Sequence, residues 1–233
     1  MTALRKIRQP TAEIALSGQA AVLDLTGGMY LPDHDVLLVA DLHFEKGSSF
    51  ARNGQFLPPY DTRETLAALA DAIARLRPRA VIALGDSFHD VGGPDRLGGL
   101  ERAALQEAQT GREWIWVTGN HDRTLPPYIG GAVLDEMELG PLILRHEPVE
   151  GAGNEIAGHL HPVGKVVMRG RGVRRRCFVT DGSRCVMPAF GAYAGGLNVC
   201  DAAFKPLFPA NFTAHLIGTE RIYAIARSVL CRD

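Results

Sequence analysis

The sequence predicts an α/β fold built on two packed β-sheets, and two patterns carry this prediction. In the first half of the chain, short apolar runs alternate with helical patterns, as expected of strands that are joined by helices. After residue 130 the helical period fades and strand patterns dominate. No linker or shift in composition divides the 233 residues, so we expect one domain over 1–233.

The apolar runs of the first half predict buried strands, because each has only four or five residues: 36–40, 80–84 and 114–117. Between the first two, an apolar stripe predicts a helix that begins at Asp61, its expected cap, and ends before Pro78. A second helix is expected over 95–109, and its buried face would hold Leu97, Leu100, Ala104 and Leu105.

The remaining strand patterns are short. A hairpin is expected before the first run, over 21–25 and 29–31. The second half of the chain predicts strands over 142–144, 163–168, 173–179, 185–187, 214–217 and 221–227. The glycine-containing turn over 169–172 predicts that the second and third of these form a hairpin.

The composition excludes several classes of protein. Lys and Arg total 25 against 26 acidic residues, which excludes a polycation held to nucleic acid by bulk charge. The four cysteines form no C-x-x-C pair and predict neither a disulfide framework nor a zinc cage, so we expect reduced thiols in a cytoplasmic protein. No long apolar stretch follows the basic residues 1–8, so we expect no secretory signal and no association with a membrane.

Side chains that can bind metal ions follow the strand patterns directly. Because the carboxyl ends of strands in α/β sheets meet at one edge, we expect these side chains to converge. Six of the eight histidines belong to the clusters. In chain order the clusters are Asp41-Leu42-His43, Gly85-Asp86-Ser87-Phe88-His89, Gly119-Asn120-His121-Asp122, Arg145-His146 and Gly158-His159-Leu160-His161.

The donors in these clusters are carboxylate, carboxamide and imidazole groups without thiolate, a mixture that suits Mn, Fe or Zn. Asp41 and His43 lie two residues apart and can bind one ion together, whereas His159 and His161 could reach two neighbouring ions. The clusters together hold more donors than one ion would take from the protein while leaving room for a substrate. Two ions about 3.5–4 Å apart that share one carboxylate would use all of them.

The ordered set D-x-H, G-D-x-x-H, G-N-H-D, H and G-H-x-H resembles the calcineurin-like binuclear metallophosphoesterases over residues 36–165. Many members have the motif G-D-x-x-D. This chain has His89 in place of the second aspartate, and in this it resembles the SbcD-like repair nucleases. Residues 40–47 (ADLHFEKG) and 188–193 (PAFGAY) look like the ligase-associated DNA damage response endonucleases, the PdeM group. The resemblance implies a metallophosphoesterase-like four-layer αββα sandwich, in which two mixed β-sheets are flanked by helices.

The resemblance also implies a role for each cluster residue. The first metal ion would be bound by Asp41, His43 and His161, the second by Asn120, His146 and His159, and Asp86 would bridge both. His121 would approach the phosphate and stabilise or protonate the leaving oxygen, Asp122 could orient its imidazole, and His89 would contact the scissile phosphate or the leaving strand. The cofactor would be two divalent ions, with Mn first and Fe or Zn as alternatives. Such a pair lowers the pKa of a shared water, whose hydroxide would attack phosphorus in line.

One segment is strongly basic although the whole chain is nearly neutral. Residues 165–176 hold six basic residues and no acidic one, while elsewhere 19 basic residues face 26 acidic ones. A basic hairpin that starts four residues after His161 is typical of a surface that positions a polyanion, and the competing interpretation is a solvated edge that resists aggregation. The candidate contacts to DNA phosphates are Arg169, Arg174, Arg175 and Arg176 in the hairpin, and Lys46 and Arg123 in loops.

Three functions compete at this point. The first, which the resemblance implies, is a manganese-dependent endonuclease that acts on single-stranded or flapped DNA in DNA repair, with a ligase or helicase as partner. The second keeps the chemistry but acts on nucleotides or other small phosphate esters, as a phosphodiesterase or phosphatase. The third is a non-catalytic scaffold, but a scaffold should have lost metal donors, and all seven are present together with His121.

Overall fold

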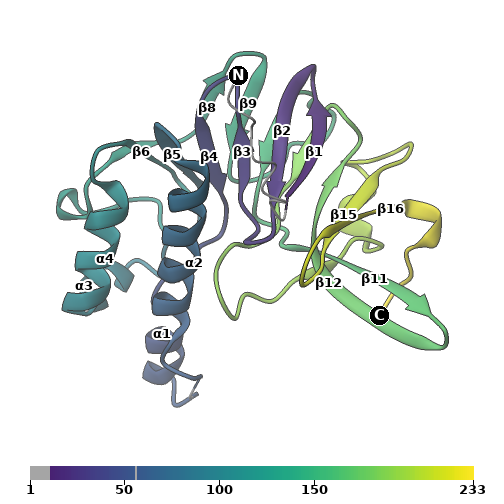
Figure 1. Cartoon of the computed structure of the whole chain (residues 1–233). Coiled ribbons are helices and arrows are strands. Elements are labelled where there is room, and N and C mark those ends of the chain that lie inside the picture. Colours follow the sequence, from purple (N-terminus) through teal and green to yellow (C-terminus); the bar gives the residue numbers. More distant parts are fainter. Residues whose placement is uncertain (1–10, 56) are drawn as a thin grey trace, which may run out of the picture.

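The three apolar runs of the first half form neighbouring parallel strands in a seven-stranded mixed sheet (Figure 1). These are β4 (Val36–Val39), β5 (Ala80–Leu84) and β6 (Glu113–Val117). β4 and β5 are buried along their whole length, as expected of strands that are covered on both faces. The computed structural model describes residues 11–55 and 57–233, so the basic residues 1–8 lie outside the described part. The other strands of this sheet are β1 (Thr11–Leu16), β2 (Gln19–Asp24), β3 (Met29–Leu31) and β7 (Ala132–Leu134).

A second mixed sheet of nine strands packs against the first. Its main order is β14-β11-β12-β13-β10-β9-β8, and β15 and β16 branch from it by pairing with the second half of β12. The bounds are β8 (Met137–Leu139), β9 (Leu142–Arg145), β10 (Glu155–Ala157), β11 (Pro162–Met168), β12 (Arg171–Thr180), β13 (Cys185–Val186), β14 (Leu197–Asn198), β15 (Thr213–Ile217) and β16 (Ile222–Ala226). The expected β-rich second half is therefore confirmed.

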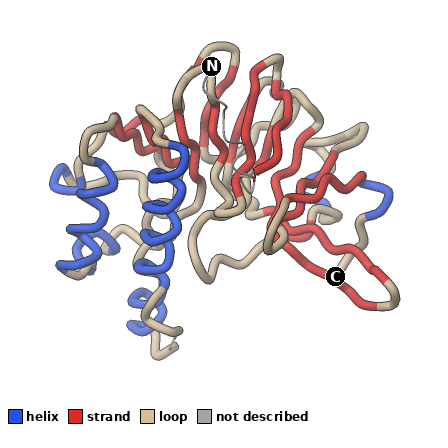
Figure 2. The backbone as a smooth tube through the Cα atoms, in the orientation of Figure 1, coloured by secondary structure: helices blue, strands red, loops and turns tan. Residues whose placement is uncertain are grey.

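The four α-helices of the described residues lie together on one side of the first sheet, and the two longer ones cover its outer face (Figure 2). They are α1 (Lys46–Arg52), α2 (Asp61–Leu76), α3 (Gly93–Arg96) and α4 (Gly99–Gln109). The outer face of the second sheet is covered instead by the segment 199–212, in which the described helical structure is the 3₁₀ turn Ala202–Phe204. The two-sheet α/β architecture is confirmed, with irregular chain rather than α-helices as its outermost layer on that side.

Three apolar cores separate these layers. The central core joins the inner faces of the two sheets, for example Leu38 and Ile82 with Leu144 and Phe178. A second core lies between the first sheet and the helices, and a third lies under the segment 199–212. Because central strands of both sheets are buried on both faces, their ends are fixed relative to one another, and the loops at those ends are held in place. Among the described residues, no helix is long and apolar enough to cross a bilayer.

Two details of the predicted helices were wrong. Asp61 does not cap α2: it is the first helical residue, and its carboxylate accepts a hydrogen bond from the backbone N–H of Gly47 (2.9 Å). The helix expected over 95–109 is broken into α3 and α4, because Leu97 and Gly98 leave the helical conformation. The break rotates the second piece, so that Leu100 and Ala104 are exposed instead of buried, while Leu97 and Leu105 are buried as predicted.

A buried ion pair ties α2 to the first sheet. Asp24 of β2 is fully buried, and its two carboxylate oxygens accept hydrogen bonds from the Arg75 guanidinium of α2 (2.6 and 2.9 Å). Burial opposes ionisation, but the hydrogen bonds from Arg75 and Thr26 outweigh it and lower the pKa of Asp24. The ion pair therefore stabilises the fold at neutral pH.

Asp24→Asn is expected to lower the free energy of unfolding by about 2 kcal/mol at neutral pH, because it leaves a half-buried guanidinium without its carboxylate. A lowered folded-state pKa means that this stabilisation is full above the ordinary carboxyl pKa, about 4, and is lost as the pH falls through the lowered value. Urea unfolding at neutral and acidic pH measures the difference. The matched control is Asp71→Asn, which removes the exposed second partner of Arg75 and should cost under about 0.5 kcal/mol.

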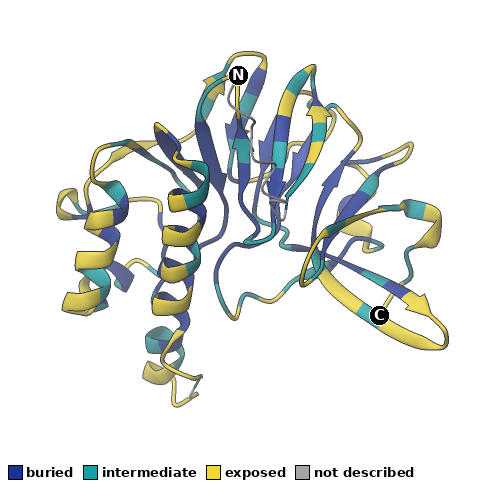
Figure 3. Cartoon of the chain, viewed as in Figure 1, coloured by how far each residue is buried: buried dark blue, intermediate teal, exposed yellow. Residues whose placement is uncertain are grey.

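Two segments of the second half extend beyond the packed part of the second sheet. The β11–β12 hairpin projects from the body of the molecule, and its tip is exposed (Figure 3). Arg169 and Gly170 form its two-residue turn, and both have positive φ, as a hairpin turn of this length requires. The segment 188–193 returns to the first sheet, where the N–H groups of Phe190 and Gly191 donate to the carbonyls of Ala40 (2.8 Å) and Asp41 (3.1 Å).

Candidate metal centre

The ends of strands from both sheets bring the predicted donor residues together. Asp41, Asp86 and Asn120 follow the parallel strands β4, β5 and β6. His146 follows β9, and His159 and His161 follow β10, which is parallel to β9. The central core holds the two sheets face to face, so donors that are more than a hundred residues apart in sequence meet at one edge.

One group of donors consists of Asp41, His43 and His161, whose ligand atoms all lie within 4.8 Å of one another. The Nε2 atoms of His43 and His161 face each other at 3.1 Å, and His161 Nε2 lies 3.2 Å from Asp41 Oδ1. Asp41 is fully buried and His43 is nearly so. Burial, with the neighbouring His161, lowers the pKa of His43 to about 3, so this imidazole keeps a free lone pair at neutral pH.

The other group consists of Asp86, His146 and His159, again with all ligand atoms within 4.8 Å. His146 Nε2 lies 3.4 Å from Asp86 Oδ2 and 3.2 Å from His159 Nδ1. Asn120 joins this group, because its Oδ1 atom lies 2.9 Å from the same His146 nitrogen. The structure thus gathers all seven predicted donors, and the bend of the loop places His159 and His161 in different groups.

The carboxylates of Asp41 and Asp86 lie next to His146, so the second group favours a positive charge between them. His146 Nδ1 lies 3.0 Å from the backbone oxygen of Leu84, to which it can donate, and this contact directs Nε2 toward the acceptor oxygens of Asp86 and Asn120. Burial favours the neutral imidazole, but the hydrogen bond to Asp86 and the charges of Asp41 and Asp86 outweigh it and raise the pKa of His146 to about 9. A proton or a metal cation can supply that charge. The oxygen and nitrogen donors of both groups fit divalent cations such as Mn, Fe or Zn.

The backbone at the donors is strained in a way that the sequence could not reveal. Left-handed φ values of this kind cost about 1–3 kcal/mol for residues other than glycine and persist where the surrounding structure enforces them. They turn each chain sharply after its strand and aim the side chains at one point. The five such donors are Asp41 (φ 53°), His43 (φ 46°), Asp86 (φ 46°), His159 (φ 69°) and His161 (φ 45°).

Two motif glycines are required by close approach of the donors. A Cβ atom on Gly85 would lie 2.3 Å from the His146 ring, and a Cβ atom on Gly119 would lie 2.2 Å from the Asp86 carboxylate. Neither position can accept a side chain without displacing a donor. The glycines that precede Asp86 and Asn120 in the sequence therefore belong to the construction of the site.

His121 stands beside the donors rather than among them. Its backbone N–H donates to Asp86 Oδ1 (2.9 Å), and its Nε2 atom lies 3.8 Å from Asp86 Oδ2. The side chain is 39% exposed, so a substrate can reach it. His89 stacks on it with ring centroids 5.4 Å apart, and Phe50, a residue that the sequence motifs did not indicate, packs against His89 at a similar distance.

Asp122 does not contact the imidazole that it was expected to orient. Its buried carboxylate accepts hydrogen bonds from the backbone N–H groups of Ser87 (2.6 Å), Phe88 (3.1 Å) and Gly119 (3.1 Å), so it holds the loop that carries Asp86. Burial raises the pKa of Asp122 to about 6. His121 is oriented instead by the backbone oxygen of His89, which accepts from Nδ1 at 2.8 Å. A backbone carbonyl has no signature in the sequence, which is why this partner was missed.

The six candidate phosphate contacts fall into different environments. Arg176 is largely buried, and its guanidinium donates to the backbone oxygen of Ala189 (2.7 Å), so it serves the structure rather than a ligand. Lys46 donates to the backbone oxygen of Tyr193 (3.1 Å) next to the Phe50 ring. The other four are exposed: Arg123, Arg169, Arg174 and Arg175.

Arg123 lines a cavity of about 420 Å³ together with Asn120 and His146. This cavity opens next to the second donor group.

The four cysteines lie outside both donor groups, and two of them, Cys177 and Cys185, are fully buried. Burial raises the pKa of both thiols, so they remain protonated core residues.

Comparison with known proteins agrees with this geometry. The sequence model of the calcineurin-like phosphoesterase family matches residues 34–170, a span that contains all seven donors and His121. No curated protein sequence matches the chain. Among solved structures, the nuclease MPE of Pseudomonas putida is similar with a TM-score of 0.70 and 29% identity over 92% of this chain and 100% of its own. The phosphoesterase YfcE of E. coli has a TM-score of 0.41 and 13% identity over 82% of this chain and 98% of its own. The chain therefore belongs to the calcineurin-like phosphoesterases and is a metal-dependent phosphoesterase.

Proposed function

We propose that this protein is a nuclease that uses two divalent ions, with Mn²⁺ as the preferred metal, to cleave single-stranded or flapped DNA in DNA repair. The observation that carries the proposal is the pair of donor groups with the exposed His121 beside them. Similarity to a nuclease over nearly the whole chain supports a nucleic acid substrate. The resemblance of the motifs suggests a ligase or helicase as the protein partner.

In this proposal, Asp41, His43 and His161 would hold one ion, Asn120, His146 and His159 would hold the other, and Asp86 would serve both. When bound, two divalent cations lower the pKa of water and offset negative charge on the phosphodiester. The chain then needs no serine or cysteine nucleophile, which agrees with the buried, protonated thiols of Cys177 and Cys185. Asp122 keeps Asp86 in place by holding its loop.

His121 is the group of this chain that we assign to the leaving oxygen. Its Nδ1–H is held by the backbone oxygen of His89, so its Nε2 atom faces the donor groups and can donate a proton there when the imidazole carries two protons. His89 backs the His121 ring and, with Lys46 nearby, forms the wall along which the leaving strand would depart.

The proposal predicts strict dependence on an added metal ion and on substrate form. Protein that has been stripped of metal with a chelator should cleave nothing, and Mn²⁺ should restore cleavage of a labelled single-stranded oligonucleotide and of a flap by at least about a hundredfold. Fe²⁺ and Zn²⁺ are added one at a time for comparison. Gel electrophoresis of the products and metal analysis of the protein give the result.

The same experiment includes a fully paired duplex and a mononucleotide. We expect the duplex to remain intact, because its backbone is not free to enter the centre as a single strand. Hydrolysis of the mononucleotide alone would instead support a phosphatase for small phosphate esters. Cleavage that persists without any divalent metal would contradict both.

A further inference from the structure

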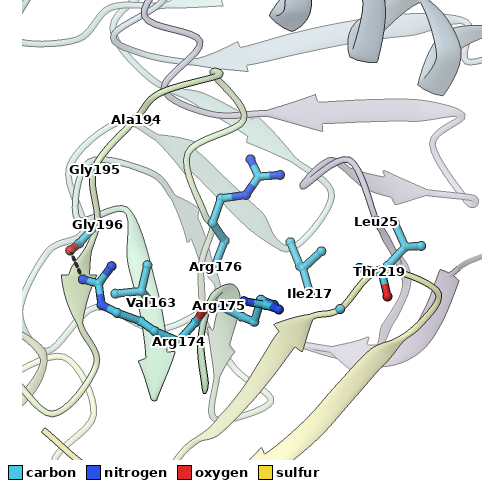
Figure 4. Close-up of a pocket in the computed structure, with 11 residues that line it drawn as sticks. Leu25, Val163, Arg174, Arg175, Arg176, Ala194, Gly195, Gly196, Ile217 and Thr219 are labelled. Carbon is cyan, nitrogen blue, oxygen red and sulfur yellow. Dashed lines mark hydrogen bonds between the residues drawn. The ribbon is translucent and has the colours of Figure 1, made fainter. Parts of the chain in front are cut away.

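Three arginines line a second cavity close to the metal centre (Figure 4). It has a volume of about 430 Å³ and lies between the base of the β11–β12 hairpin, the loop after β15 and the glycine-rich loop before β14. We call it the arginine pocket: Leu25, Val163 and Ile217 form its apolar side, and the rest of its lining includes Arg174, Arg175, Arg176, Gly195, Gly196 and Thr219.

The arginine pocket is separate from the donor groups but directly attached to one of them. None of the seven donors lines it. Gly196 precedes Leu197, whose N–H donates to the backbone oxygen of His161 (3.1 Å), and Val163, two residues after His161, forms part of its wall. A ligand in the pocket would therefore lie beside the first donor group without occupying it.

The three arginines of the pocket are not equivalent. The Arg176 guanidinium donates hydrogen bonds to the backbone oxygens of Ala189, Phe190 and Thr26. These N–H groups are therefore already paired within the protein. Arg174 donates to the Gly196 oxygen (2.7 Å) and forms an ion pair with Asp233 (3.2 Å), which offsets its charge.

Arg175 is the cation that remains available. Its hydrogen bond within the described chain goes from Nη1 to the adjacent backbone oxygen of Arg174 (3.0 Å), and it has no ion pair there. A guanidinium carries five N–H donors, so most of those of Arg175 are free. Figure 4 shows its side chain extending across the pocket toward Ile217 and Thr219. No acidic residue lines the pocket, so its net charge is positive.

These features fit an anion that the backbone can approach closely. A Cβ atom is absent at Gly195, where nothing lies within 4 Å of its position, the Thr219 hydroxyl can donate, and a guanidinium matches the geometry of phosphate oxygens. A single phosphate ester bound to the metal ions could not reach this pocket as well. An extended strand could, because its phosphates repeat along the backbone. At the second donor group, the cavity with the exposed Arg123 offers a further cation for the same strand.

We propose that the arginine pocket binds, through Arg175, a phosphate of the nucleic acid strand that flanks the phosphate being cleaved. This inference rests on the proposed nuclease function and deepens it, because it gives the substrate as a strand with several phosphates that enters past the first donor group. The proposal also divides the basic hairpin into two parts. Direct contact with the strand is made at the base of the hairpin, where Arg175 lies, and the tip only adds positive charge.

The test compares Arg175→Ala with Arg171→Ala, which removes the same charge from the same strand but from a residue that does not line the pocket. With Mn²⁺ and a labelled single-stranded oligonucleotide, Arg175→Ala should lower kcat/KM by about tenfold, mainly through KM, and Arg171→Ala by less than about threefold. Arg175→Lys should recover part of the loss. The salt dependence of KM should weaken for Arg175→Ala by a slope of about 0.7.

Bis(p-nitrophenyl) phosphate, which has a single phosphate, and the bound metal content report on the metal centre of each variant. The ratio of oligonucleotide cleavage to hydrolysis of this diester should fall about tenfold for Arg175→Ala. If the wild type cleaves the oligonucleotide and the two alanine variants lose the same activity, the pocket assignment is wrong while the nuclease function stands. If the wild type hydrolyses only the small diester, the proposed function fails, and the pocket assignment fails with it.

Discussion

Replacement of Asp86 by asparagine is expected to lower the metal-dependent cleavage of an oligonucleotide by at least about a thousandfold. Asp86 is buried beside His146, and its carboxylate also accepts the backbone N–H of His121, so it connects the second donor group to the proposed proton donor. Asparagine keeps the shape but removes the negative charge that offsets the two cations. Kinetics with saturating Mn²⁺ and metal analysis of the purified variant measure the loss.

We expect the metal content of the Asp86→Asn variant to fall below that of the wild type, because a neutral amide binds divalent cations more weakly than a carboxylate. The control is Asp71→Asn, an equal change at an exposed helical position that contacts neither donor group. This control should retain wild-type cleavage and metal content. Full metal binding together with near-normal cleavage in the Asp86 variant would show that this carboxylate is not shared by the metal ions.

His121→Ala is expected to lower oligonucleotide cleavage by about a hundredfold to ten-thousandfold while leaving the metal content unchanged. The imidazole lies outside both donor groups but faces Asp86, and it is held by the backbone oxygen of His89. A deoxyribose oxygen is a poor leaving group and needs a proton as it departs. The p-nitrophenolate of bis(p-nitrophenyl) phosphate leaves without one, so hydrolysis of that diester should fall much less.

The comparison of the two substrates separates a proton donor from a metal ligand. If His121 bound metal, its loss would reduce the metal content and would slow both reactions equally. A matched control is His34→Ala, which removes an imidazole that contacts Gln19 at a site apart from the donors. This variant should cleave both substrates at the wild-type rate.

The fold could be predicted wherever a local pattern was sufficient. The strands β4, β5 and β6 and the helix α2 follow from apolar runs and an apolar stripe, because each element buries its own side chains. The break between α3 and α4 was not visible, since a helical period continues through Leu97 in the sequence. Leu100 shows the consequence: its pattern predicts burial, but the break turns it toward solvent.

The metal site was predictable to a similar extent and for a similar reason. Donor residues stand directly after strands, and the parallel order of β4, β5 and β6 brings strand ends to one edge, so the sequence alone indicated which side chains meet. Their strained backbone and the fit of Gly85 and Gly119 against them depend on distances between chain segments, and no local pattern encodes those distances.

The sequence by itself therefore determined the α/β class, the residues that gather as candidate donors and the presence of a basic hairpin. Only the tertiary structure decided the roles of single side chains. Asp122 holds a loop rather than His121, and Arg176 serves the backbone while Arg175 stays free. The physical reason is that these roles depend on hydrogen bonds to backbone groups of distant segments. Every residue offers the same backbone groups, so a partner of this kind is chosen by the packing of the sheets and leaves no mark in the sequence.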